Sequence, residues 1–209
     1  MRPFRSLSRD MLWRSHIDDP ATPERLVSRV HSLITKELST PARRPVLFFC
    51  IGTDRSTGDA LGPLIGTRLV ALGLDASHVW GTLDFPVHAA NLQAAIDKAY
   101  SSFQNPYVIA ADACLGKLEN VGMVTVSAGP LRPGTGVSKT LPPVGDIHVT
   151  GIVNVGGYME YLVLQNTRLS VVIKMAEVIS RALQQATGKF IRLPEEESDQ
   201  ASTIGPRCD

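Results

Sequence analysis

Two aspartates in this sequence have the residue type and the placement that the activation of water requires. Asp59 lies in "GTDRSTGDALG", between the apolar run 46–51 and a segment with leucines at helical spacing. Asp112 lies in "VIAADACLG", after a second apolar run. Ligands of open α/β sheets bind outside the carboxyl ends of the strands, so we expect both acids to face one cleft. There, one ionised carboxylate would take a proton from water while the other, with a raised pKa, protonates the leaving group.

The loop around Asp59 also supplies candidate binding residues. Ser56 or Thr57 is expected to cap the following helix, which would place Asp59 in the first helical turn, where the macrodipole favours a negative charge. The polar side chains expected to bind the ligand are Thr53, Asp54, Arg55, Ser56 and Thr57. A structural role is the alternative for both acids: Asp59 would cap a helix, and Asp112 would cap a turn or bind backbone amides.

A histidine beside the two acids would permit a different chemistry, in which a divalent metal ion assists hydrolysis. The available imidazoles are His88 in "PVHAANL" and His148 in "GDIHVTG". The candidate metal ligands are Asp59, Asp112 and His148. Each histidine has a structural alternative, as a hydrogen-bonded side chain, and the aspartate mechanism itself needs no cofactor.

Several other chemistries have no motif in this sequence. The loop "GTDRSTGDALG" matches neither the dinucleotide-binding nor the P-loop fingerprint. Ser56 and Ser127 lack the G-x-S-x-G elbow of serine hydrolases. Cys50 and Cys114 each end an apolar run, so they are expected to be buried at strand ends rather than to act as nucleophiles.

The composition is that of an ordinary globular protein. The 209 residues suit one domain, with 44% hydrophobic and 20% charged residues. A net charge of +1 offers no electrostatic attraction for nucleic acid or a membrane surface. Three cysteines without zinc-type spacing indicate reduced thiols, and no apolar segment resembles a signal or a membrane span. We therefore expect a soluble, cytoplasmic protein.

Helical and strand patterns alternate along the chain, which predicts a mostly parallel sheet with helices on both faces. The expected helices cover 22–38, the segment after Ser56, 87–100, and one or two helices in 158–187 that break near "QNTR". The expected strands cover 46–51, 78–83, 106–116, 122–128 and 147–155. Residues 129–146 hold four glycines and four prolines and are expected to form a mobile loop beside the cleft. The domain is predicted to span 19–190, with a flexible arm at 1–18 and a disordered acidic tail at 191–209.

Long and unusual strings in this sequence carry a resemblance to a known family. They include "CIGTDRSTGDALGPLIGTRL", "VWGTLDFPVHAANL", "VIAADACLG", "GVSKTLPPVGDIHVTGIVN" and "GGYMEYLVLQNTRLSVVIKMAE". Over about 45–182 the chain resembles the sporulation protein YyaC family of spore-forming Firmicutes. More distantly it is similar to the germination protease, whose T-P-D-A-L-G-P and I-D-A-L stretches align with "GDALGP" and "ADAC". This alignment places the catalytic acids of that protease at Asp59 and Asp112.

The chain also resembles the hydrogenase maturation endopeptidases, whose nickel-sensing site uses two acids and a histidine. These resemblances imply a three-layer α/β/α sandwich, and an endopeptidase that acts on small acid-soluble spore proteins inside the forespore or spore. The motif departs from its relatives at Thr53, where they usually carry Asn, and at Gly58, which replaces a proline of the germination protease. A protease-like protein that binds a spore partner without cleaving it, and a metal-assisted peptidase, are the alternatives.

Overall fold

The fold is built on one six-stranded sheet. The computed structural model describes residues 13–38, 44–134 and 141–191, and the strand order is β1-β5-β6-β4-β2-β3. The strands are β1 Trp13–His16, β2 Val46–Cys50, β3 Val79–Trp80, β4 Tyr107–Gly116, β5 Met123–Ala128 and β6 Ile147–Val155. Strands β3, β2, β4 and β6 are parallel neighbours, whereas β5 is antiparallel to both β6 and β1. The prediction of a mostly parallel sheet is therefore confirmed.

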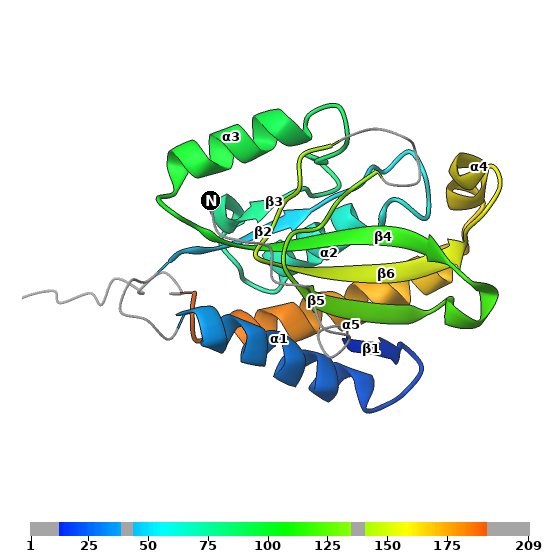
Figure 1. Ribbon diagram of the computed structural model, residues 1–209, viewed down its shortest axis with the longest axis horizontal. Helices are drawn as coiled ribbons and strands as arrows, with labels where there is room; N and C mark the ends of the chain where they lie inside the picture. Colours follow the sequence, from blue (N-terminus) through cyan, green and yellow to red (C-terminus); the bar gives the residue numbers. More distant parts are fainter. Residues whose placement is uncertain (1–12, 39–43, 135–140, 192–209) are drawn as a thin grey trace, which may run out of the picture.

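Helices cover both faces of this sheet, which gives the predicted α/β/α sandwich. The helices are α1 Thr22–Leu38, α2 Leu61–Ala71, α3 Leu92–Ser102, α4 Glu160–Gln165 and α5 Leu169–Thr187, with the 3-10 turns η2 Ala76–His78 and η3 Leu118–Asn120. Figure 1 shows α3 on one side of the sheet and α1 and α5 on the other, where α2 also packs against α5. Strand β2, "VLFFC", is buried at every position because both of its faces are covered.

Each face of the sheet has its own hydrophobic core. Phe48 of β2 belongs to the core beneath α1, α2 and α5, whereas its neighbour Phe49 belongs to the core beneath α3. The alternation follows from the two-residue period of a strand. In β4 the same alternation places Ile109 and Ala111 toward α5, and Val108 and Ala110 toward α3.

Three helical segments can be compared directly with the predictions from the sequence. Helix α1 spans the predicted 22–38, and its regularly spaced apolar residues, such as Leu26 and Val30, are fully buried. The predicted helical stretch 158–187 is divided into α4 and α5, as the sequence indicated near "QNTR". The helix expected at 87–100 begins only at Leu92, because Val87 forms a parallel bridge with Ile51 and 88–91 form a turn.

Two predicted segments, the N-terminal arm and the strand at 78–83, differ in the structure, and the predicted tail is not among the described residues. The arm predicted at 1–18 is wrong for Trp13–His16, which form β1 because they pair with β5 in register from Trp13↔Val126 to His16↔Met123. The strand expected at 78–83 is reduced to Val79–Trp80. The acidic tail beyond residue 191 lies outside the described residues.

The glycine- and proline-rich loop 129–146 is described at both ends. Leu131 and Val144 are buried and exchange two backbone hydrogen bonds, of 2.8 and 3.0 Å. Both side chains pack in the core beneath α3, so this loop extends the cover of that face. Residues 135–140, on which much of the predicted mobility rests, lie outside the described part of the chain.

Candidate active site

Asp59 lies in the turn that joins β2 to α2. Helix α2 begins at Leu61, and its N-cap residue is Ala60, which makes no side-chain cap hydrogen bond. The prediction that Ser56 or Thr57 caps the helix is therefore wrong, and Asp59 precedes the first turn instead of lying in it. The reason is that 56–60 form a turn of their own, closed by a 2.9 Å bond from the Ala60 N–H to the Ser56 carbonyl.

Close backbone contacts fix the position of this turn. Gly52 has a φ of +144°, and a Cβ built on it would lie 1.9 Å from the Asp59 carbonyl oxygen. The same carbonyl accepts a 3.2 Å hydrogen bond from the Thr53 N–H. Only a glycine combines this φ with such a close approach. The loop therefore folds back on the end of β2 and places Asp59 beside it.

Asp112 lies on β4 just beyond the point where β2 ends. The strand predicted at 106–116 is β4, which continues to Gly116, so Asp112 lies within the strand and not at its carboxyl end. The last paired residue of β2, Cys50, lies opposite Ala111, so Asp112 is the first residue of β4 past this partner. Its side chain is 9% exposed, and one carboxylate oxygen accepts a 2.8 Å hydrogen bond from the Ala113 N–H.

The structure brings these two carboxyl groups into electrostatic contact. Burial, and then the charge of Asp59, raise the pKa of Asp112 well above its ordinary value, against a lowering by the Ala113 N–H. Burial also raises the pKa of Asp59, but the Thr53 N–H and the charge of His88 act in the opposite direction. Burial and the neighbouring charge thus favour the protonated form of Asp112, whereas the Thr53 N–H and His88 favour the ionised form of Asp59.

The two candidate histidines lie in different surroundings. His88 lies in the turn before α3, where it is close enough to Asp59 to lower the pKa of that acid. His148 lies on β6 opposite Ala110, and its Nδ1 is 2.9 Å from the Gly129 carbonyl oxygen. The carbonyl can only accept, so this nitrogen carries the proton and the bond fixes the orientation of the ring.

The candidate metal ligands are not assembled into a metal site. Among the described residues, no group of three or more histidine, cysteine, aspartate or glutamate side chains could hold a metal ion. Asp59, Asp112 and His148 all belong to the described part of the chain, so the structure does not bring them together as a ligand set.

The polar residues of the Asp59 loop differ in exposure. Asp54 and Arg55 are exposed, Thr53 and Thr57 are half-buried, and Ser56 is buried. The Thr53 hydroxyl accepts a 3.3 Å bond from the Arg55 N–H, so it stabilises the loop. Within the described part of the chain, the Oγ atom of Ser56 has no hydrogen-bond partner. A buried hydroxyl without a partner is costly, so Ser56 is the loop residue best suited to contact a ligand or water.

A polar strip beside Asp112 was missed by the sequence reasoning. Thr150 of β6 lies opposite Asp112, and its hydroxyl is 2.6 Å from that of Thr125 on β5. Thr150 also hydrogen-bonds Cys114, whose thiol has a raised pKa because of burial and the charge of Asp112. The pattern that could have revealed this strip is the alternation of buried and half-buried residues along β5 and β6, which leaves one face of these strands polar.

Cys50, in contrast to Cys114, is fully buried as predicted, and burial raises the pKa of its thiol to about 12.

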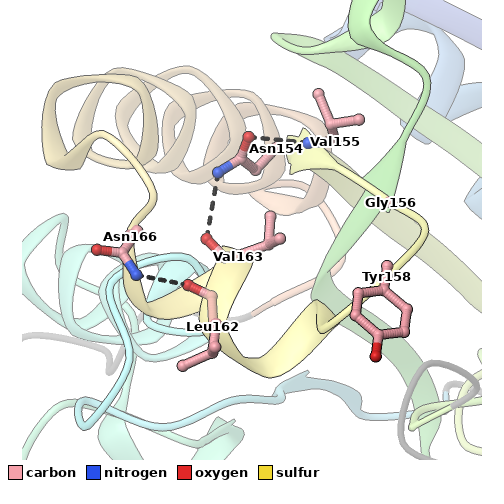
Figure 2. Close-up of a pocket in the computed structure, with 7 residues that line it drawn as sticks. All are labelled: Asn154, Val155, Gly156, Tyr158, Leu162, Val163 and Asn166. Atoms are coloured by element: carbon pink, nitrogen blue, oxygen red, sulfur yellow. Dashed lines mark hydrogen bonds between the residues drawn. The ribbon is translucent and has the colours of Figure 1, made fainter.

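A pocket of about 510 Å³ opens near this site, between the end of β6 and α4. Figure 2 shows its lining residues, which are Asn154, Val155, Gly156, Tyr158, Leu162, Val163 and Asn166. The Asn154 amide donates to the Val163 carbonyl at 3.2 Å and so ties β6 to α4 (Figure 2). The Gly58 N–H donates to the Leu164 carbonyl at 2.8 Å, which ties α4 to the Asp59 loop. A proline at position 58 would have no N–H to give to this bond.

The surface around α4 is apolar and exposed. Tyr158 is 88% exposed, Tyr161 is 62% exposed and Met159 is 56% exposed. In Figure 1, α4 lies beyond the carboxyl ends of β4 and β6, at the same end of the sheet as the pocket. Among the described helices, none has the length and apolar character needed to cross a membrane.

Comparisons with known proteins show the family of this chain. Residues 14–182 match the family described as "Protein of unknown function (DUF1256)". The chain is also similar to "Uncharacterized protein YyaC" of Bacillus subtilis (strain 168), with 47% identity over 180 residues, which is 86% of this chain and 85% of that protein. The matched residues include both aspartates, β4, β6 and α4. The chain therefore belongs to the DUF1256 family and to the family of the YyaC relative.

Proposed function

We propose that the protein is an endopeptidase in which Asp59 and Asp112 act as a pair on one water molecule. The observation that carries this proposal is that Asp59 and Asp112, from different elements, both lie where β2 ends, and that the charge of Asp59 raises the pKa of Asp112. Their surroundings differ, since Asp112 is more deeply buried and Asp59 accepts stabilisation from Thr53 and His88. Pairs of acids with pKa values pushed apart by their surroundings are typical of general acid–base catalysis.

Each carboxyl group then has one role in the reaction. The ionised Asp59 takes a proton from water, and the oxygen of that water attacks the carbonyl carbon of the scissile peptide bond. The protonated Asp112 gives its proton to the nitrogen of the leaving amine as the C–N bond breaks. After one turnover Asp59 is protonated and Asp112 is ionised, so a proton must pass from the first to the second before the next cycle. A bridging water would carry this proton, and the effect of the Asp59 charge on the pKa of Asp112 supports such a route.

The resemblance to the germination protease supports small acid-soluble spore proteins as the substrate and the forespore as the location. A second function, partner binding without cleavage, is favoured by the exposed apolar surface of Tyr158, Met159 and Tyr161. Exposed aromatic residues of this kind are enriched where proteins bind one another.

Incubation with purified small acid-soluble spore proteins tests the proposal, with fragments identified by mass spectrometry. Wild type and Asp97→Asn should produce the same fragments, because Asp97 is exposed on α3 away from the pair. Asp59→Asn should produce almost none. If wild type leaves every spore protein intact and still retains one in a pull-down that Tyr158→Ser and Tyr161→Ser weaken, the binding function replaces the peptidase.

A further inference from the structure

The carboxyl half of β4 has an open edge on the side of β2, directly after Asp112. β2 ends opposite Ala111, whose carbonyl accepts a 2.7 Å bond from the Ile51 N–H. β4 continues through Asp112–Gly116 and remains paired with β6 on its other side. Residues 113–116 are half-buried, so this edge is not covered completely.

The pattern of hydrogen bonds between the strands shows toward which neighbour each backbone N–H and C=O group of β4 points. The N–H and C=O of one strand residue point to the same side, and the next residue points to the opposite side. Ala111 faces β2, so Ala113 and Leu115 face the open side. Gly116 faces β6, since its carbonyl accepts a 2.7 Å bond from the Gly156 N–H.

Among the described residues, a hydrogen-bond partner is found for only one of these outward groups. The Ala113 N–H donates to the carboxylate of Asp112. For the Ala113 carbonyl, and for the N–H and carbonyl of Leu115, no hydrogen bond is found within the described residues. The segment "DACLG" also lacks the lysine and proline that commonly protect a strand edge from pairing.

We propose that an extended segment of the substrate adds to β4 as a short strand along Ala113 and Leu115, so that its backbone passes Asp112. This inference rests on the proposed peptidase function, and it names the substrate class as unfolded or extended polypeptide. Main-chain hydrogen bonds then provide the affinity, as in other cases of strand addition, while side-chain pockets provide the selectivity.

The pocket beside α4 indicates what kind of side chain the substrate carries just beyond the stretch that pairs with β4. Gly156 lines this pocket and is hydrogen-bonded to Gly116, the residue at the end of the open edge. This pocket, bordered by Leu162, Val163 and Tyr158, lies on the β6 side of β4, so a substrate chain that leaves the open edge would cross the end of β4 to enter it. The substrate segment therefore carries an apolar residue just beyond its paired stretch.

The probe is a phage library of random 12-residue peptides, selected on full-length Asp59→Asn so that cleavage does not remove the bound peptides. Selected peptides are then synthesised with one N-methyl group at each position in turn. N-methylation should weaken binding at least tenfold at alternate positions and leave the positions between unchanged, because only every second N–H faces β4. An apolar residue should recur at one fixed position.

Two variants test the edge from the side of the protein. Leu115→Pro removes the outward N–H and should lower peptide affinity at least tenfold, whereas Leu115→Ala keeps the N–H and should bind. If Leu115→Pro does not fold, the N-methylated peptides still test whether the bound segment pairs with β4. The proposal is overturned if no peptide is selected, if N-methylation acts without a two-residue period, or if the edge is occupied by a second copy in a dimer that Leu115→Pro dissociates. Periodic binding without any cleavage by wild type would refute the peptidase alone, and cleavage without the period would refute the edge alone.

Discussion

The charge of Asp59 raises the pKa of Asp112, although the two residues are separated by a helix, a strand and a further helix in the sequence. One acid is held by a turn that folds back on β2, and the other is the first residue of β4 past the end of β2. The end of one strand thus defines the place where both carboxyl groups meet.

Neutralising Asp112 should stabilise the fold above acidic pH. The pKa of Asp112 is higher in the folded chain than in the unfolded chain, so folding takes up a proton and stability falls as pH rises above about 4. Asp112→Asn removes this penalty, and its amide oxygen can still accept the Ala113 N–H. We expect its free energy of unfolding at pH 7 to exceed that of wild type by more than about 1 kcal/mol.

Urea unfolding at several pH values measures this difference, which should shrink toward zero as pH falls to about 4. Asp97→Asn, on the exposed surface of α3, should match wild type throughout. A destabilised Asp112→Asn at pH 7 would show that the carboxylate is ionised and structurally required, against the acid role assigned to it.

Gly52→Ala should destabilise the fold and displace Asp59. The substitution imposes a Cβ on a φ of +144° and places it against the Asp59 carbonyl. We expect a loss of about 2–4 kcal/mol, from backbone strain and overpacking together. Gly188→Ala is the matched control, because Gly188 has a helical φ of −55° and the nearest described atom to the new Cβ is the Gln184 carbonyl oxygen, at an ordinary contact distance of 3.4 Å. Equal thermal stability of the two variants would contradict the described packing of the loop.

Chelation should leave cleavage unchanged. In the described part of the chain no set of ligands is assembled for a metal ion, and the nitrogen Nδ1 of His148 is bonded to Gly129. Rates measured with and without EDTA should agree within a factor of about two. Loss of cleavage in EDTA, restored by a divalent metal and abolished in His148→Ala, would support the metal-assisted alternative instead.

Local patterns in the sequence predicted the elements that are defined by their own residues. The apolar period of α1 and the continuous apolar run of β2 are properties of single segments, and both were predicted closely. β1 was missed because its four residues have no period of their own and become a strand only by pairing with β5. The start of α2 was misplaced because the turn before it is closed by Thr53 and Ser56, which lie earlier in the chain.

The candidate site could be predicted in part for the same reason. Asp59 and Asp112 each follow an apolar run, so their residue type and strand position could be read from the sequence. The Thr125–Thr150 pair and the link from Gly58 to Leu164 depend on strand register and on the packing of α4. The open edge of β4 depends on the difference in length between two strands, which single-segment patterns do not define.

The most direct test of the central claim is a double-mutant cycle on the rate of cleavage of a small acid-soluble spore protein. Asp59→Asn and Asp112→Asn should each lower the rate by about 10² to 10⁴, the range for a general acid or base. The double variant should lose scarcely more than either single variant, because the two groups act as one unit. A wild-type protein without activity, a single variant that retains the wild-type rate, or two losses that multiply independently would contradict the pair.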